Sequence, residues 1–438
     1  MMLPRFKSLP EWADISPAEM AARGRDLPGF VFFDSSKEAE AGGSLSILAA
    51  YPEERIEGNL FHDADYERLH SRVLEMQSSG NGVDDGLPGC LIAGTVDYDG
   101  AFQMAFYPMV LAYQHSGGGW VGSGNLAECF QNRVPPARLH GPVDFQPHWG
   151  AEQFCQAVSR AQEYIAAGDI YQVNLSHALE APWPGGDPWA FYEALRHYSP
   201  APYSAFLSQA KRTVLSSSPE LFLQVSGSGI RTRPIKGTRP RRPDPNADER
   251  SAFDLLTSPK EIAELVMITD LERSDLGQVC EWGSVAVRDL LKLERHEQVF
   301  HLVSTVEGRL REGVNAVEAL RACFPGGSIT GAPKRRAREI IRELEEQERG
   351  IYTGAIGWFG ASGESAFSIA IRTVVVENGR ACLRVGAGVV ADSIPESEWQ
   401  ETWDKAAGVL LAAQWARRSP DRSLPEVPTS AISHSTGL

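Results

Sequence analysis

The chain is dominated by short apolar runs of strand length, with fewer segments of helical spacing. Residues 28–50 contain two apolar runs around a polar turn, and 91–100 with 102–113 predict a strand pair. The remaining predicted strands lie at 170–181, at 205–225 as a hairpin, at 282–310, and at 352–390 as three successive strands with glycine-containing turns.

Helical spacing of apolar residues is clearest over 152–167, a segment that Gly168 can end. The same periodicity recurs in segments that also carry many charged residues. These further predicted helices cover 251–268, 334–347 and 396–416.

Two segments interrupt these patterns. Residues 114–150 are rich in Gly, Pro and Asn and predict a loop or a domain seam, and 231–250 predict a loop because their prolines disfavour regular structure. Since strands and helices are interspersed without a βαβα rhythm, the pattern predicts an α+β fold. We expect an N-terminal region at 1–145, a larger domain at 146–415 and a disordered, Ser/Pro-rich tail at 416–438.

Composition narrows the class of protein. The 438 residues carry 42 Lys and Arg against 57 Asp and Glu, which argues against nucleic-acid binding but leaves room for a locally basic site for a small anion. The six cysteines form no CxxC pair, so we expect reduced thiols in a cytoplasmic protein. The N-terminus does not resemble a signal peptide, and no apolar stretch approaches 18 residues, so we expect no membrane association.

No nucleotide, zinc or GxSxG fingerprint is present, so the candidates are polar residues inside apolar segments. Glu220, in SSSPELFLQV, can serve as a general acid if burial keeps it protonated; alone, an exposed turn residue explains it better. Lys236, in RPIKGTRP, is one of only eight lysines, and Gly237 lets backbone approach a ligand there. A lysine removed from water is partly uncharged and nucleophilic, although a solvated basic loop is the simpler reading of this motif alone.

Two further features suit a metal ion or an anion. Glu264 and Glu401 lie in separate predicted helices, and two carboxylates suit Mg²⁺, although such residues usually form a solvated helix face. The glycine-rich turn 326–331 precedes a helix, so its free N–H groups either bind an anion or simply begin that helix.

Arg372 is a lone cation in the apolar run AFSIAIRTVVV, with Tyr352 before it and a Gly386-Ala387-Gly388 turn after it. Burying an arginine is costly unless it meets an anion, so we expect either a substrate carboxylate or a structural ion pair. His301, in VFHLVS, fits a satisfied core residue better than a catalytic one when taken alone.

Taken in order, these segments resemble one family. The chain carries SPE at 218–220, PIKGT at 234–238, AELVMITDLERSDLG at 263–277, FPGGSITGAPK at 324–334, IAIRT at 369–373, and GAGVVADS at 386–393 followed by QET at 400–402. This series strongly resembles the chorismate-utilising enzymes, which include anthranilate, aminodeoxychorismate, isochorismate and salicylate synthases. The resemblance is dense from about 150 to 412 and looser from 28 to 113. It implies a large layered β-sandwich with helices packed outside.

The resemblance assigns chemistry to individual residues. The PIKGT form is typical of aminodeoxychorismate synthases, where related enzymes usually carry Ala at the lysine, so Lys236 would attack C2 of chorismate while Glu220 protonates the departing C4 hydroxyl. Ammonia would then attack C4 and expel the lysine, giving 4-amino-4-deoxychorismate. Since no glutaminase is fused to the sequence, the resemblance implies a separate glutamine amidotransferase subunit.

Other matching positions would bind the substrate and Mg²⁺. Glu264 and Glu401 match the family's Mg²⁺ ligands, and the metal would hold the ring carboxylate. Further matches are Tyr352, Arg372 and the Gly388 N–H for the enolpyruvyl carboxylate, Thr238 and His301 for the ring, the N–H groups of Gly327 and Ser328 for the ring carboxylate and metal, and Lys405 and Lys334 for positive potential.

Two points leave alternatives open. The family's R-N-D-L-G has Ser274 in place of Asn, which changes a hydrogen bond of that segment. Ser35, Pro202 and Tyr203 occupy positions that form an amino-acid effector pocket in relatives. Anthranilate synthase component I remains the closest alternative activity, followed by isochorismate or salicylate synthase. A non-catalytic binding relative is the alternative from another class.

Overall fold

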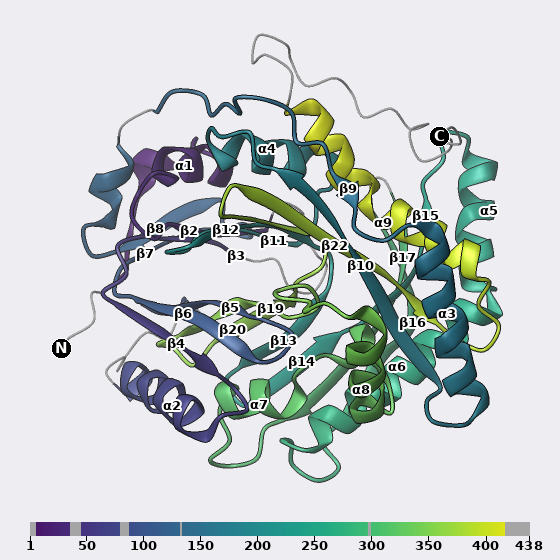
Figure 1. Cartoon of the computed structure of the whole chain (residues 1–438). Coiled ribbons are helices and arrows are strands. Elements are labelled where there is room, and N and C mark those ends of the chain that lie inside the picture. Colours follow the sequence, from purple (N-terminus) through teal and green to yellow (C-terminus); the bar gives the residue numbers. More distant parts are fainter. Residues whose placement is uncertain (1–5, 36–44, 79–86, 132–133, 297–298, 417–438) are drawn as a thin grey trace.

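The computed structural model describes residues 6–35, 45–78, 87–131, 134–296 and 299–416. Two large antiparallel sheets lie face to face, and helices cover their outer surfaces (Figure 1). This arrangement confirms the predicted α+β class and the layered sandwich.

The first sheet has 12 strands within the described residues, all of them antiparallel to their neighbours. In spatial order they are β1 (Phe6–Ser8), β8 (Gly119–Ser123), β7 (Val110–Gln114), β3 (Leu45–Ala49), β2 (Val31–Asp34), β11 (Tyr203–Ser208), β12 (Arg212–Ser218), β21 (Thr373–Glu377), β22 (Arg380–Val389), β10 (Gln172–Pro182) and β18 (Gly331–Ala332), with β9 (Gln146–Pro147) beside β10.

The second sheet has 10 strands over the same described ranges. They are β15 (Ile235–Pro240), β17 (Val299–Arg309), β14 (Gly229–Arg233), β13 (Leu221–Ser226), β20 (Ser365–Ile369), β19 (Ala355–Gly360), β5 (Leu91–Val96), β6 (Ala101–Tyr107) and β4 (Glu54–Asn59), with β16 (Ala286–Arg295) beside β17.

Helices cover the outer faces of both sheets (Figure 1). Over the first sheet lie α1 (Pro17–Gly24), α4 (Pro188–Tyr198) and α9 (Pro395–Trp415), with the short η1 (Pro10–Trp12) and η2 (Leu126–Phe130). Over the second sheet lie α2 (Asp63–Ser78), α6 (Pro259–Gly277) and α7 (Ala316–Cys323). The remaining elements, on the side where β10 begins, are α3 (Ala151–Ala166), α5 (Pro245–Leu256), η3 (Gly327–Ile329) and α8 (Lys334–Glu345).

Apolar side chains fill the space between the sheets and beneath the helices. Ile47 and Leu207 of the first sheet pack with Leu91 and Trp358 of the second, and each is almost inaccessible to water. Because strands at this interface are covered on both faces, their sequences are apolar runs rather than alternating patterns.

The chain crosses from one sheet to the other at two adjacent points. β12 of the first sheet continues into β13 of the second through Pro219 and Glu220, and β20 of the second continues into β21 of the first through 370–372. The Ile369 N–H donates to the Glu220 carbonyl at 3.1 Å, and the Ser217 N–H donates to the Arg372 carbonyl at 3.1 Å. These bonds hold the two crossings side by side, and both carry predicted site residues.

Several sequence predictions hold and others are corrected. The strands in 28–50 and 170–181 and the helices near 152–167, 334–347 and 396–416 are confirmed. The predicted strands and helices below were wrong in detail. The predicted strand 102–113 divides at Pro108 into β6 and β7, which belong to different sheets, and the predicted loop 114–150 contains β8. Residues 205–225 form the predicted hairpin and then cross to the other sheet. The predicted helix 251–268 covers parts of two helices, the second of which begins at Pro259, and 352–390 forms four strands rather than three.

The predicted loop 231–250 was also wrong, since it forms β14, β15 and the start of α5. Its prolines do not interrupt the ladder, because Pro234 separates β14 from β15 and Pro240 ends β15. β15 stands at the end of its sheet and pairs with β17, a position that tolerates prolines.

The remaining sequence predictions concern the divisions of the chain. The boundary at 145 stays a prediction, and both sheets contain strands from either side of it. The predicted tail lies outside the described residues from 417 onward. All six cysteines are free thiols. None of the helices in the described ranges is long and apolar enough to cross a lipid bilayer.

Candidate active site

The catalytic candidate Glu220 lies at the first sheet crossing, where its side chain is almost fully buried. Its Oε1 accepts a hydrogen bond from Ser328 Oγ at 2.6 Å. Burial raises the pKa of Glu220, while the Ser328 hydroxyl and the charge of Lys236 act in the opposite direction. A carboxyl group in these surroundings holds its proton more readily than one in water, as a general acid requires.

Lys236 lies on β15, and its side chain is only 16% exposed. Its Nζ lies 2.7 Å from Oε1 of Glu264, which projects from α6. Since the Lys236 charge also acts on Glu220, the amine lies close to the candidate acid. The structure therefore brings Lys236, Glu220 and Glu264 together from three elements.

Glu401 and Lys405 are one turn apart on α9 and form an ion pair at 2.7 Å. Burial would raise the pKa of Glu401, but Lys405, Lys260 and Lys236 together outweigh it, and the pKa is lowered. Loss of hydration would lower the pKa of Lys405, although its side chain is 44% exposed, but Glu401, Tyr352 and Glu264 together raise it. Since Glu264 also acts on Lys405, the two glutamates face a common space.

The two carboxylates fit a magnesium ion by their chemistry. Each one already pairs with a cation, Glu264 with Lys236 and Glu401 with Lys405. The described residues contain no cluster of three or more His, Cys, Asp or Glu side chains that could hold a metal. Two protein carboxylates are a ligand set that Mg²⁺ accepts when water and substrate oxygens complete its shell, and a magnesium site here stays a prediction.

Gly388 lies in β22, so the expected turn at 386–388 is strand instead. A Cβ atom at this position would lie 2.7 Å from Gln172 Nε2 and 2.8 Å from Glu264 Oε1. A larger residue here would therefore displace the ends of the Gln172 and Glu264 side chains from their present positions. Gln172 donates to the same Glu264 oxygen at 2.6 Å, while its own Oε1 is buried and finds no hydrogen-bond partner in the described part of the chain.

Arg372 was predicted inside a strand and instead occupies the second crossing, with a φ of 49°. Burial lowers the pKa of its guanidinium, and no described residue forms an ion pair or hydrogen bond with that group. A partly exposed guanidinium without a carboxylate partner among the described residues suits an anionic ligand. The alternative of a structural ion pair is therefore unsupported among the described residues.

His301 and Thr238 are cross-strand neighbours on β17 and β15, and Thr238 Oγ1 lies 3.0 Å from His301 Nδ1. Burial, together with the nearby Arg372 charge, lowers the pKa of His301 to about 3. The imidazole is therefore neutral, and it contacts Thr238 on the strand that carries Lys236.

Tyr352 is largely buried beside β22, where a Cβ atom on Gly386 would lie 2.8 Å from the Tyr352 hydroxyl. Arg349, three residues earlier, donates to Glu345, to the Ile329 carbonyl and to Thr353 Oγ1. Because Arg349 and Glu345 are both buried, this network rigidly supports the chain around Tyr352.

The glycine-rich turn differs from expectation in one respect. The Gly327 N–H, expected to meet a substrate carboxylate, donates to buried Glu272 Oε1 at 2.9 Å. Ser328 contributes through its hydroxyl, which reaches Glu220. The turn therefore supports the candidate acid.

Lys334 was expected to add positive potential to the site. Its Nζ instead pairs with Asp275 at 2.5 Å and donates to the Cys323 carbonyl at 2.9 Å. Ser274, which departs from the family pattern, lies in α6 with its side chain exposed to solvent. Its substitution therefore changes the outside of a helix rather than a turn.

The expected effector residues lie near the meeting of β2 and β11. Ser35 donates from Oγ to the Leu45 carbonyl at 2.9 Å, and Pro202 directly precedes β11. The hydroxyl of Tyr203 is buried and has no hydrogen-bond partner within the described part of the chain. An effector role for these three residues stays a prediction.

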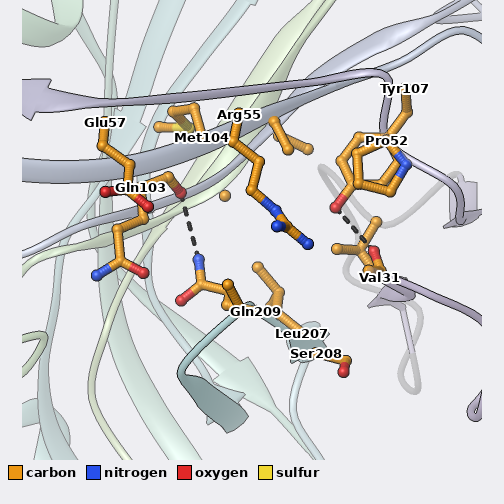
Figure 2. A pocket seen from close by; sticks show the side chains of 15 residues that line it. Val31, Pro52, Arg55, Glu57, Gln103, Met104, Tyr107, Leu207, Ser208 and Gln209 are labelled. Carbon is orange, nitrogen blue, oxygen red and sulfur yellow. Dashed lines mark hydrogen bonds between the residues drawn. The ribbon is translucent and has the colours of Figure 1, made fainter.

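A small cleft elsewhere in the sandwich is unsuited to the substrate. It lies between the sheets beside Gln103, Tyr107 and Gln209, with a cavity volume of about 30 Å³ (Figure 2). Gln209 donates across it to the Gln103 carbonyl at 3.2 Å. This volume suits a single water molecule rather than a six-membered ring.

Comparison with known proteins assigns the chain to a family. A family model described as chorismate binding enzyme matches residues 122–411, and the chain belongs to this family. Anthranilate synthase component 1 of Streptomyces coelicolor is 47% identical over 278 residues, covering 63% of this chain and 54% of that protein. Aminodeoxychorismate synthase component 1 of Bacillus subtilis is 46% identical over 261 residues, covering 60% and 55%.

The protein of the same name from Escherichia coli is 46% identical over 267 residues, covering 61% of this chain and 59% of that one. The matched part of the chain thus spans little more than half of these relatives. A crystal structure of anthranilate synthase component I from Streptococcus pneumoniae TIGR4 superposes with a TM-score of 0.73 at 30% identity, covering 85% of this chain and 93% of that one.

Sequence reasoning missed two residues of the site. Gln172 gave no signal, because a glutamine at the start of an apolar strand is unremarkable. Glu272 did give a usable signal in the sequence. It follows Leu265 and Ile268 and precedes Leu276 at helical spacing, on the buried face of α6. An acidic residue at such a position points to a specific partner.

Proposed function

We propose that the chain is the synthase subunit of an aminodeoxychorismate synthase, which converts chorismate and ammonia to 4-amino-4-deoxychorismate. The observation that carries this proposal is the position of Lys236, whose Nζ is 2.7 Å from Glu264 and whose charge acts on Glu220. A nucleophilic amine beside a buried acid suits the displacement of a ring hydroxyl.

In the first half of the proposed reaction, Lys236 leaves its ion pair with Glu264, gives its extra proton to water, and forms a bond from its neutral amine to C2 of chorismate. The ring double bonds shift, the C4–oxygen bond breaks, and Glu220 gives its proton to the oxygen, which leaves as water. The raised pKa of Glu220 supports this role, because the group must arrive protonated.

In the second half, ammonia forms a bond to C4, the double bonds shift back, and the bond between C2 and the lysine nitrogen breaks. The surplus proton of ammonia returns to Glu220, which restores the acid, and Lys236 is released as an amine. Chorismate and ammonia are thus converted to 4-amino-4-deoxychorismate and water, with no redox change.

The substrate carboxylates require cationic and N–H partners. Arg372, together with Tyr352 and the Gly388 N–H, would bind the enolpyruvyl carboxylate, and the unpaired guanidinium supports this. Thr238 and His301 would contact the ring, and the neutral imidazole suits a hydrogen bond.

Glu264 and Glu401 would hold Mg²⁺, which when bound offsets the charge of the ring carboxylate. Lys405, beside Glu401, would strengthen the positive potential of the site.

We further propose that a glutamine amidotransferase subunit supplies the ammonia in the cytoplasm, on the route to 4-aminobenzoate and folate. The relatives named as component 1 of aminodeoxychorismate synthase support a partner subunit, since that name implies a second component.

The test is a chromatographic product assay with chorismate, Mg²⁺ and ammonium. We expect 4-amino-4-deoxychorismate from the wild type and none from Lys236→Ala, with chorismate binding largely retained. Lys211→Ala is the control, since Lys211 lies in the turn between β11 and β12. Full synthase activity in Lys236→Ala would refute the nucleophile assignment.

Anthranilate synthase is the second candidate, favoured by the identity of 47% to a relative of that name. Its product carries nitrogen at C2 and has lost pyruvate, so the same assay distinguishes the two. Release of pyruvate with anthranilate would replace the proposal, and product formed without any nitrogen source would indicate an isochorismate or salicylate synthase.

A further inference from the structure

Glu272 is a buried acid that the proposed reaction does not use. It projects from the inner face of α6 and is 2% exposed. Its Oε1 accepts the Gly327 N–H at 2.9 Å, while its Oε2 is buried and has no hydrogen-bond partner among the residues that the structure describes. A buried carboxyl group with only one backbone contact needs an explanation beyond packing.

The charges around Glu272 favour its neutral form. The groups that face it are Asp275 on the same helix, Lys334 on α8, Glu220 at the sheet crossing and the thiol of Cys323 at the end of α7. Lys334 forms its ion pair with Asp275, and its charge only partly opposes the effect of burial on Glu272. Burial and the Asp275 carboxylate raise the pKa of Glu272 to about 8.

A short chain of contacts connects this neutral acid to the candidate catalytic acid. Gly327 is bonded to Glu272, and the next residue, Ser328, donates from Oγ to Glu220 Oε1 at 2.6 Å. The far end of the same turn is held separately, because Arg349 Nη1 donates to the Ile329 carbonyl at 3.2 Å. Glu272 therefore holds the N–H group at the first end of the turn, where the Gly326 and Gly327 carbonyls accept from Thr330 Oγ1 at 2.9 and 3.3 Å.

We propose that Glu272 is a positioning residue, which acts as a neutral hydrogen-bond acceptor to hold the 327–328 turn and, through the Ser328 hydroxyl, the carboxyl group of Glu220. This inference rests on the proposed function for its catalytic consequence. Its structural part, the anchoring of the turn, stands independently of the reaction.

Two variants of Glu272 distinguish the effect of its hydrogen-bond acceptor from the effect of its charge. Glu272→Gln keeps a neutral acceptor for the Gly327 N–H, so we expect kcat and KM within about twofold of the wild type. Glu272→Leu removes the acceptor, and we expect kcat to fall by about 10- to 100-fold with little change in KM, because a displaced acid slows the chemical step. Asp270→Asn, on the exposed face of the same helix, is the control.

A double-mutant cycle tests the path through Ser328. In a Ser328→Ala background the contact to Glu220 is already absent, so Glu272→Leu should cause no further loss of kcat. Equal losses from Glu272→Leu in both backgrounds would overturn the proposal, as would a Glu272→Gln variant as impaired as Glu272→Leu.

Hydrogen exchange separates failure of this inference from failure of the proposed function. We expect faster amide exchange over 326–330 in Glu272→Leu than in the wild type or Glu272→Gln. If Glu272→Leu does not fold, Glu272→Asp, which is one methylene shorter, replaces it. Unchanged exchange would refute the anchoring role even in an active enzyme. Faster exchange without any chorismate turnover would refute the proposed function alone.

Discussion

Removing the hydrogen bond from Ser328 to Glu220 is the most direct way to change the pKa of the candidate acid. The two side chains meet at 2.6 Å, and both are buried. The Ser328 hydroxyl stabilises the carboxylate form, so it lowers the pKa of Glu220 against the stronger effect of burial. Ser328→Ala removes this bond with little change in volume.

The expected size of the effect follows from this contact. A hydrogen bond to a charged group contributes about 1.5–3 kcal/mol. Because a change of one pH unit corresponds to about 1.36 kcal/mol, the pKa of Glu220 should rise by about one to two pH units. A general acid must be protonated, so activity is lost as pH rises through this pKa, and the variant should stay active to higher pH.

The assay is the pH dependence of kcat/KM for chorismate with saturating Mg²⁺ and a constant concentration of free ammonia. Ser216→Ala is the matched control, since its buried hydroxyl contacts Thr373 at 2.8 Å rather than Glu220. If the fall of kcat/KM at alkaline pH occurs at the same pH in Ser328→Ala as in the wild type, or at a lower pH, the assignment of Glu220 as the acid would be contradicted.

Three further variants test other parts of the site. Arg372→Met should raise KM for chorismate by about 10- to 100-fold, because a charged hydrogen-bond partner of a carboxylate is lost; an unchanged KM would contradict a role in binding. Glu345→Gln should destabilise the fold by about 3–5 kcal/mol in chemical denaturation, since it leaves two buried guanidinium groups without a counter-charge, whereas exposed Glu343→Gln should change little. Chelation should abolish activity reversibly, and Glu264→Gln should require more Mg²⁺ for half-maximal activity; activity unaffected by chelation would exclude the metal role.

From the sequence, it was easier to predict which residues belong to the candidate site than to predict their backbone positions and contacts. Lys236 and Glu264 are 28 positions apart, yet the motif series placed both in one site, and the structure joins them at 2.7 Å. The position of Arg372 was less accessible to prediction. Its surroundings form one apolar run, and the run has the same pattern on either side of the point where the chain changes sheets.

Long-range pairing was the part that the sequence did not predict. The hydrogen bond from the Gly327 N–H to Glu272 and the ion pair between Lys334 and Asp275 both depend on how α6 packs against the turn and α8. Local periodicity describes which face of each element is buried and not which polar groups meet there. The loop predicted over 231–250 failed for a related reason, since prolines at strand ends are compatible with β15.

The central claim is that Lys236 bonds covalently to the substrate, and intact-protein mass spectrometry tests it most directly. With chorismate and Mg²⁺ but without ammonia, we expect a fraction of the protein to gain the mass of chorismate less one water, located on the peptide that carries Lys236. The adduct should be absent from Lys236→Ala and should disappear when ammonium is added. Synthesis of 4-amino-4-deoxychorismate by a wild-type enzyme that never carries this mass, together with a Lys236→Ala variant that remains active, would contradict the account.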